Sequence, residues 1–322
     1  MNDAENHLLL AALDKRWNEY YAELKSCRQE ASKEAVHDLR VAARRLLSMI
    51  DLLRAVAPAP RLQKLRTTFK DQLNRLEDLR DTQVMMVEVS EVLDDLPEAW
   101  PFLAHLNKKE RRLLRETRRQ IQLTKPGDMI KRISVVRRSV VKLFEDEDQL
   151  NLSMFETVDN ALALVLQRAA LLDPGRPATI HSLRIAFRKL RYLVEIVHPG
   201  LPGYPEELLG IMHDFQAMMG DIQDIEVLLD GLVQFAEKDA SFNPEPVRRF
   251  FRKRHAEAID TFFQGMPKLE SFWRTSRTAA FPWAVRRRRR PSAQRVTKAA
   301  GQVLPPTDNE ASPELGAQAG RP

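Results

Sequence analysis

The stretch IHSLRIAFRKLRYL at 180–193 decides the fold, because it places a core stripe and a basic stripe on one helix. At about 100° per residue, its main cationic residues fall within an arc of about 80°. That arc holds one histidine and three arginines: His181, Arg184, Arg188 and Arg191. Leucine and other apolar residues occupy the opposite side. The segment is therefore predicted to be an amphipathic helix that buries one face and presents a row of positive charge on the other.

The stretch VHDLRVAARRLLSM at 36–49 repeats this pattern 144 residues earlier. His37, Arg40 and Arg44 share one arc, and Arg45 falls where the later copy has Lys189. A second pair of similar blocks follows at a shift of 143, LEDLRDTQV at 76–84 and MGDIQDIEV at 219–227. Two matched blocks in the same order predict two similar structural units.

The fold class follows from apolar residues at helical spacing along nearly the whole chain, without a convincing alternating strand pattern. Proline and glycine separate the predicted helices, one of which covers 60–94 without interruption. The sequence therefore predicts an all-α protein built from two similar antiparallel four-helix units. We assign 1–121 to the first unit, 122–151 to a connecting helix and linker, 152–268 to the second unit, and 269–322 to a disordered basic tail.

Composition restricts where and with what the protein works. A single cysteine, Cys27, excludes an internal disulfide and suits a reducing compartment. No secretory signal pattern is found, and no apolar run approaches the roughly 20 residues that cross a bilayer. We therefore expect a cytoplasmic protein without a membrane partner. The net charge of +6 is concentrated after residue 282, so residues 1–282 are nearly neutral and only the arrangement of their charges is informative.

The basic stripes predict an anion site. Arginines one helical turn apart repel each other by a few tenths of a kcal/mol, and both copies keep them. Guanidinium groups match phosphate oxygens bidentately, which favours phosphate as the anion. Two alternatives stay open: a solvated face, and ion pairing with the aspartates of the second blocks, Asp78, Asp81, Asp221 and Asp224. We expect these aspartates to orient arginines rather than bind a metal.

Further basic residues could widen the site. Lys70, with Arg66, precedes the first aspartate block, and we include Lys70 among the site residues. The runs RRLLRETRR at 111–119 and VRRFFRKRH at 247–255 are read either as extensions of the site or as solvated helix surface. The run RRRRR at 286–290 is a generic polybasic segment.

With these motifs in place, the sequence resembles the CHAD family, the conserved histidine α-helical domain. The resemblance rests on the two H-x-x-R-x-x-x-R-[RK]-L stretches, each followed by a D-x-x-D block, and covers about 1–270. It implies two four-helix bundles with pseudo-two-fold symmetry, a basic channel that binds inorganic polyphosphate, and association with polyphosphate granules. The residues implied for the channel are His37, Arg40, Arg44, Arg45, His181, Arg184, Arg188, Lys189 and Arg191.

Two departures from the family pattern suggest unequal halves. Leu47 stands where the family often has a basic residue, which the second copy keeps as Arg191, and Arg80 of the first copy is Gln223 in the second.

Polyphosphate binding has three rival functions. A helical metal-dependent phosphohydrolase is disfavoured because the repeat replaces His37-Asp38 by His181-Ser182 and keeps the arginines instead. Nucleic-acid binding is disfavoured because the stripes lack interleaved aromatic residues. A structural adaptor would use the stripes as buried ion pairs. We predict a non-enzymatic polyphosphate-binding protein with no catalytic residue, metal or cofactor, and leave its oligomeric state open.

Overall fold

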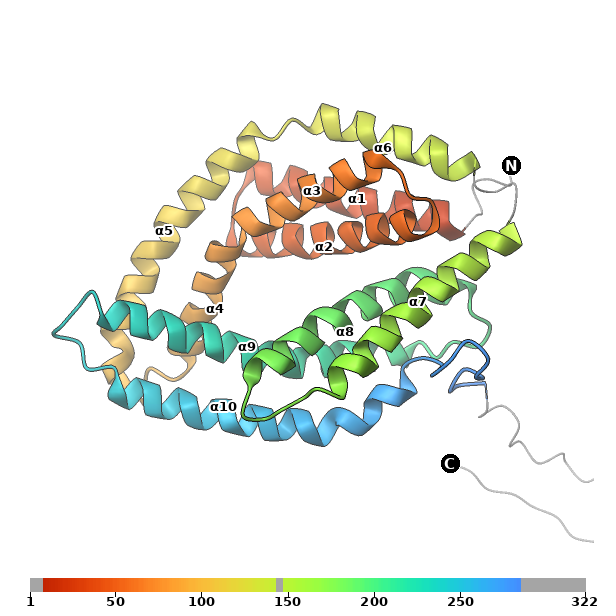
Figure 1. The fold of residues 1–322 in the computed structure, drawn as a ribbon. Helices are drawn as coiled ribbons and strands as arrows, with labels where there is room; N and C mark the ends of the chain where they lie inside the picture. Colours follow the sequence, from red (N-terminus) through yellow and green to blue (C-terminus); the bar gives the residue numbers. More distant parts are fainter. Residues whose placement is uncertain (1–7, 143–146, 285–322) are drawn as a thin grey trace, which may run out of the picture. The chain divides into compact units, whose positions relative to one another are not determined.

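The computed structural model describes residues 8–142 and 147–284, and every α-helix and shorter 3-10 turn within them confirms the all-α prediction (Figure 1). Over these residues the chain forms ten α-helices: α1 (Leu8–Gln29), α2 (Lys33–Val56), α3 (Pro60–Arg75), α4 (Glu77–Glu91), α5 (Trp100–Leu123), α6 (Pro126–Val141), α7 (Glu147–Ala169), α8 (Pro177–Val197), α9 (Glu207–Ala236) and α10 (Glu245–Gly265). Among the described helices, none is long and apolar enough to cross a membrane.

Local sequence explains several helix boundaries. Pro60, Pro126 and Pro177 each occupy the first turn of a helix, where the missing N–H costs no hydrogen bond. The N-terminus of α2 is capped by Ser32, whose side chain accepts a hydrogen bond from the Ala35 amide at 3.1 Å. The basic stripe of α2 therefore begins on a well-defined helix.

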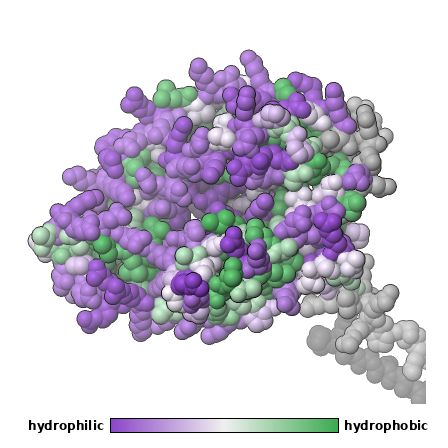
Figure 2. Space-filling view, in the orientation of Figure 1, coloured by the Kyte–Doolittle hydropathy of each residue, from purple (hydrophilic) through white to green (hydrophobic). Residues whose placement is uncertain are grey.

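The two halves repeat one arrangement of helices. The α1–α2 hairpin of the first half matches the α7–α8 hairpin of the second, and in each half the next helical segment packs on the hairpin. Helix α2 also packs against both α7 and α8, so the two stripe-bearing helices contact each other (Figure 1). The face shown in Figure 2 is mostly hydrophilic, particularly over α3 and α5.

The prediction of one helix over 60–94 is wrong. The chain bends at Leu76, where φ is −95° and ψ is 0°, and this bend separates α3 from α4. Leu76 itself is buried. No proline or glycine marks this bend. It turns α4 toward α5 and α9, whereas α3 packs on α2 and α6.

The hydrophobic core is shared between the two halves. A larger cluster contains buried residues from all ten of these helices, including Leu46 and Leu190 from the two stripe-bearing helices. A smaller cluster joins α4 and α5 to parts of α9 and α10. Helices α1 to α10 accordingly fall in one compact unit. The predicted units 1–121 and 152–268 do not have separate hydrophobic cores.

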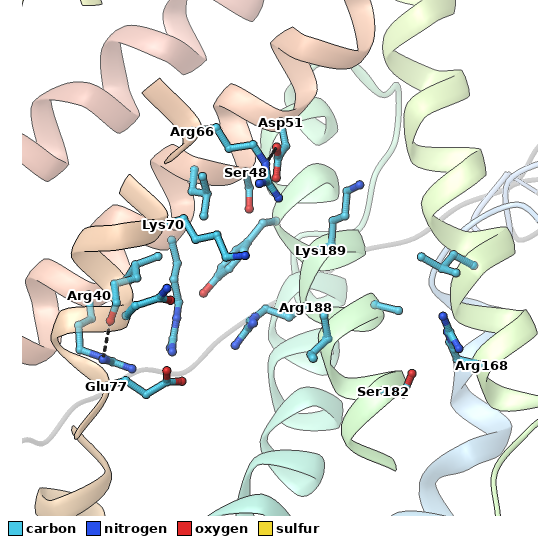
Figure 3. Close-up of a pocket in the computed structure, with 18 residues that line it drawn as sticks. Arg40, Ser48, Asp51, Arg66, Lys70, Glu77, Arg168, Ser182, Arg188 and Lys189 are labelled. Atoms are coloured by element: carbon cyan, nitrogen blue, oxygen red, sulfur yellow. Dashed lines mark hydrogen bonds and ion pairs between the residues drawn. The ribbon is translucent and has the colours of Figure 1, made fainter. Parts of the chain in front are cut away.

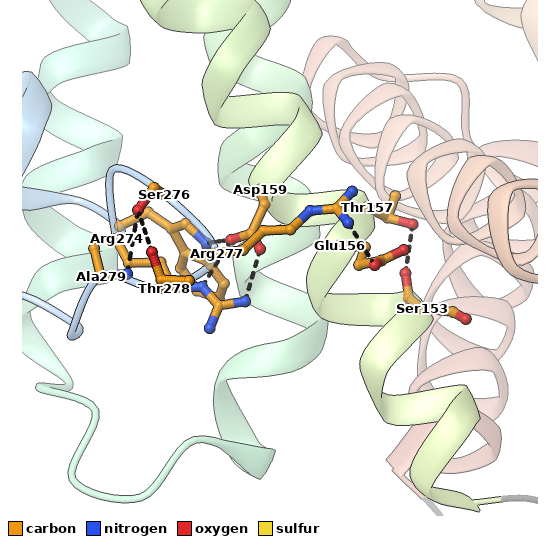
Figure 4. Close-up of polar contacts among 10 residues, drawn as sticks. Ser153, Glu156, Thr157, Asp159, Arg274, Ser276, Arg277, Thr278 and Ala279 are labelled. Atoms are coloured by element: carbon orange, nitrogen blue, oxygen red, sulfur yellow. Dashed lines mark hydrogen bonds and ion pairs between the residues drawn. The ribbon is translucent and has the colours of Figure 1, made fainter.

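The segment after α10 corrects the predicted tail. Trp273 is fully buried, and its indole Nε1 donates a hydrogen bond to Asp159 of α7 at 2.8 Å. Arg274 pairs with the same carboxylate at 2.6 Å, and Arg277 pairs with Glu156 at 2.7 Å (Figure 4). Disorder from residue 269 is therefore wrong over 269–284, because aromatic burial and ion pairs anchor this stretch. The run at 286–290 lies outside the described residues.

Candidate anion-binding cleft

A cleft of about 610 Å³ lies where the two halves meet. Its walls come from α2, α3 and α4 on one side and from α7 and α8 on the other. Figure 3 shows Arg40 and Lys70 on the first side and Arg188 and Lys189 on the second. The charged lining residues are seven cations and two carboxylates: Arg40, Arg44, Arg66, Lys70, Arg168, Arg188 and Lys189, with Asp51 and Glu77. The cleft therefore has a strong excess of positive charge.

The guanidinium groups in this cleft repel one another. Burial, followed by the neighbouring charge of Arg44, lowers the pKa of Arg40 to about 9. Burial and then the charges of Arg44 and Arg184 lower the pKa of Arg188 to about 10. Both groups remain charged at neutral pH. Because Arg44 of α2 acts on Arg188 of α8, the two stripes contribute to one electrostatic site that an anion would stabilise.

Most of these cations are not neutralised by the protein. Within the part of the chain that the structure describes, no ion pair joins a carboxylate to Arg44, Lys70, Arg188 or Lys189. Arg66 differs, because its Nε lies 2.7 Å from Asp51. The unpaired groups are therefore available to an anionic ligand.

The aspartate blocks hold an arginine between the halves. Arg80 of α4 contacts Asp81 at 3.2 Å and Asp224 of α9 at 2.7 Å. Burial works against the charge of Arg80, but Asp224 and Asp81 outweigh it and raise the pKa of Arg80. Within residues 8–142 and 147–284, no group of three His, Cys, Asp or Glu is arranged to hold a metal ion. Asp81 and Asp224 thus position the guanidinium group of Arg80.

A second hollow of about 540 Å³ adjoins the cleft. Arg40 lines both spaces, and His37, Arg80 and Asp224 line only the second. The histidine of the first stripe therefore faces the neighbouring hollow rather than the main cleft.

Two of the sequence-predicted residues pair with a buried carboxylate instead of lining the cleft. Arg191 lies 2.6 Å from Glu195, and Arg45 lies 3.4 Å from the same carboxylate. Arg16 of α1 approaches Glu195 at 3.3 Å. Glu195 is 9% exposed, as are Arg16 and Arg191. Arg191 and Arg45 therefore form internal ion pairs, but their partner is Glu195 and not one of the four aspartates expected from the sequence.

Not all of the remaining predicted residues line the cleft. Arg184 and His181 do not line the cleft. Burial lowers the pKa of Arg184, and Asp224 partly offsets that effect. His181 contacts Gln223 through its Nδ1. Five predicted residues line the cleft itself: Arg40, Arg44, Lys70, Arg188 and Lys189.

Sequence reasoning missed several residues of the cleft. Tyr192 and Ser48 occupy matched positions of the repeat and both line it, so the repeat held a signal for them. Arg168 belongs to no motif and reaches the cleft because α7 pairs with α8. Nothing in the local sequence marks it.

Comparisons with known proteins support the family. The model of the CHAD domain matches residues 11–233, which include both basic stripes and both aspartate blocks. The chain is similar to the crystal structure of the CHAD domain from the plant Ricinus communis, with a TM-score of 0.61 and 20% identity. That similarity covers 81% of this chain and 90% of the plant chain, and it concerns the fold. No curated protein matches the chain. Since the family model matches more than half of its residues, the chain belongs to the CHAD family.

Proposed function

We propose that this protein binds inorganic polyphosphate in the cleft between α2 and α8 without catalysing a reaction on it. One observation carries the proposal: both copies of the repeat contribute arginine or lysine to the lining of the same cleft. Seven cations and two carboxylates line it. A ligand for this site must supply several negative charges at once.

The spacing of the cations favours a linear chain of phosphates. Arg40 and Arg44 lie one helical turn apart, a rise of about 5 Å, so their guanidinium groups can bind neighbouring phosphates along a chain. Arg188 of α8 contributes from the opposite wall. Inside the cleft, Tyr192 is the one aromatic residue among the described lining, which disfavours single-stranded nucleic acid held by base stacking.

The lining also favours binding over chemistry. Its two carboxylates are Asp51, which is held by Arg66, and Glu77.

A polyphosphate-binding protein of this kind would associate with polyphosphate granules in the cytoplasm, and that location is part of the proposal.

A titration across a salt series tests the proposal. The purified chain is titrated with polyphosphate and, in parallel, with duplex DNA at the same concentration of phosphate charges. We expect tight polyphosphate binding with a steep salt dependence and much weaker DNA binding. Equal affinity for both polyanions would replace the proposal with a generic basic surface. Absence of binding to either would overturn it. Phosphate release during the titration would overturn the non-enzymatic part.

A further inference from the structure

Helix α5 carries a third row of cationic residues with the spacing of the first two. His105, Lys108, Arg112 and Arg115 follow one another at intervals of 3, 4 and 3. His181, Arg184, Arg188 and Arg191 have the same intervals on α8. The row on α5 lies outside the cleft, and none of its members lines it. The row on α5 is therefore a feature separate from the cleft.

This row borders a separate pocket of about 380 Å³ between α5 and α9. Five of the residues that line it are cations: Lys108, Lys109, Arg112, Arg115 and Lys238. No carboxylate is among its described lining residues. Arg112 does pair with Glu116 at 3.6 Å, but both side chains are more than half exposed, so the pair is weak and can be displaced. The five cations of this pocket are therefore not neutralised by any carboxylate among its described lining residues.

The lining of this pocket is more aromatic than that of the cleft, where Tyr192 is the one aromatic residue of the described lining. Phe102, Leu106 and Phe235 line the pocket together with the ring of His105. The imidazole of His105 lies 4.8 Å from the ring of Phe235, measured between centroids. Burial, followed by the charges of Lys238 and the lysines of α5, lowers the pKa of His105, which favours the neutral ring. Such a surface accepts a flat ring.

The fold itself does not require cations at Arg112 and Arg115, whereas Lys108 matches another cation, Lys253, in the second half. The buried residues Phe102, Leu106 and Thr117 of α5 match Val247, Phe251 and Phe262 of α10 at a constant shift of 145. At that shift Arg112 and Arg115 fall on Glu257 and Asp260. The second half thus keeps the core positions with acidic residues at the same surface positions.

From this combination we propose a second ligand site, distinct from the cleft, that binds a nucleotide carrying a chain of phosphates. The base lies against His105 and the apolar lining residues, and the phosphates are bound by Lys108, Arg112 and Arg115. The size of the pocket suits a compact ligand of this kind rather than a long polymer.

The test compares three probes on the full chain: ATP, inorganic triphosphate and adenosine. Binding is measured by calorimetry, and saturation-transfer NMR reports whether the adenine ring contacts the protein. The titrations are made with the parent chain, with the cleft variant R44Q/R188Q, and with the pocket variant R112E/R115E. Circular dichroism checks that each variant is folded, and the exposed positions of Arg112 and Arg115 make that outcome expected.

We expect ATP to bind the parent and the cleft variant alike, and to bind the pocket variant at least about tenfold more weakly. Inorganic triphosphate should bind more weakly than ATP, because it lacks a ring. The proposal is overturned if ATP affinity falls only in the cleft variant, or if triphosphate binds as tightly as ATP without ring contacts. If polyphosphate binding fails but ATP binding depends on Arg112 and Arg115, the proposed function is lost and this site remains.

Discussion

Helices α2 and α8 carry nearly the same sequence motif, yet they use it differently. At matched positions, Asp51 of α2 lies at the cleft and pairs with Arg66, whereas Glu195 of α8 is buried. Lys189 lines the cleft, but its counterpart Arg45 lies 3.4 Å from Glu195. Different subsets of the cations of α2 and α8 thus line the cleft.

The difference between these helices shows that the role of an arginine depends on its nearest carboxylate. Arg188 and Arg191 belong to one stripe on one helix, three residues apart. Arg188 has no carboxylate partner among the described residues, whereas Arg191 lies 2.6 Å from Glu195. The first is available to a ligand and the second stabilises the fold. Predictions can separate the two roles.

The largest expected effect is on stability. Glu195→Gln removes the carboxylate that three buried or half-buried arginines share, Arg16, Arg45 and Arg191. Breaking a buried ion pair costs about 3–5 kcal/mol in free energy of unfolding, because uncompensated charge stays inside. Urea denaturation of the variant and the parent measures the loss.

The control for that prediction is Asp51→Asn at the matched position of α2. Asp51 and its partners Arg54 and Arg66 are partly exposed, so we expect a loss of about 1 kcal/mol or less. If the two variants lose equal stability, the contrast between the buried and the cleft-facing carboxylate is wrong.

The next effect separates binding from stability within one stripe. Arg188→Gln removes a cleft cation, and we expect polyphosphate affinity to fall by about tenfold or more with a shallower salt dependence. Arg191→Gln should lower the free energy of unfolding and leave the salt dependence of binding unchanged. Polyphosphate titrations and urea denaturation of both variants check this. The opposite assignment of the two effects would contradict it.

The smallest effect comes from making the halves more alike. Leu47 lines the cleft at the position that Arg191 occupies in the second copy. Leu47→Arg adds a cation to the cleft. In α2 the counterpart of Glu195 is Asp51, and Asp51 already pairs with Arg66, so the new arginine would have no free carboxylate partner there. We expect polyphosphate to bind a few-fold more tightly and the salt slope to steepen by about one unit. Unchanged affinity would mean that the ligand does not reach this part of the cleft.

Much of the fold could be predicted because its signals are local. Helical periodicity and proline at the first turn of α3, α6 and α8 marked the helices, and the repeat indicated the matching halves. The bend at Leu76 carries no such signal, because packing of α4 on α5 and α9 sets it. The order of 269–284 was missed because Trp273 and Phe281 are spaced without helical periodicity and depend on Asp159 and on one another.

The candidate site was only partly predictable for a related reason. Helical spacing indicated which cations share a face, and Arg40, Arg44 and Arg188 do line the cleft. Spacing could not show that Arg191 forms an ion pair with Glu195 one turn away, or that Arg16 of α1 pairs with the same carboxylate. Those contacts depend on how α1, α2 and α8 pack, which a single helix does not encode.

The central claim is that the stripes of both halves form one polyphosphate site, and the variant R44Q/R188Q tests it most directly. Polyphosphate titrations of this variant and the parent across a salt series should show at least about a hundredfold loss of affinity and a salt slope lower by about two units. Its unfolding midpoint in urea should not fall, because neither arginine has a carboxylate partner among the described residues. Unchanged affinity and slope in a folded variant would contradict the claim.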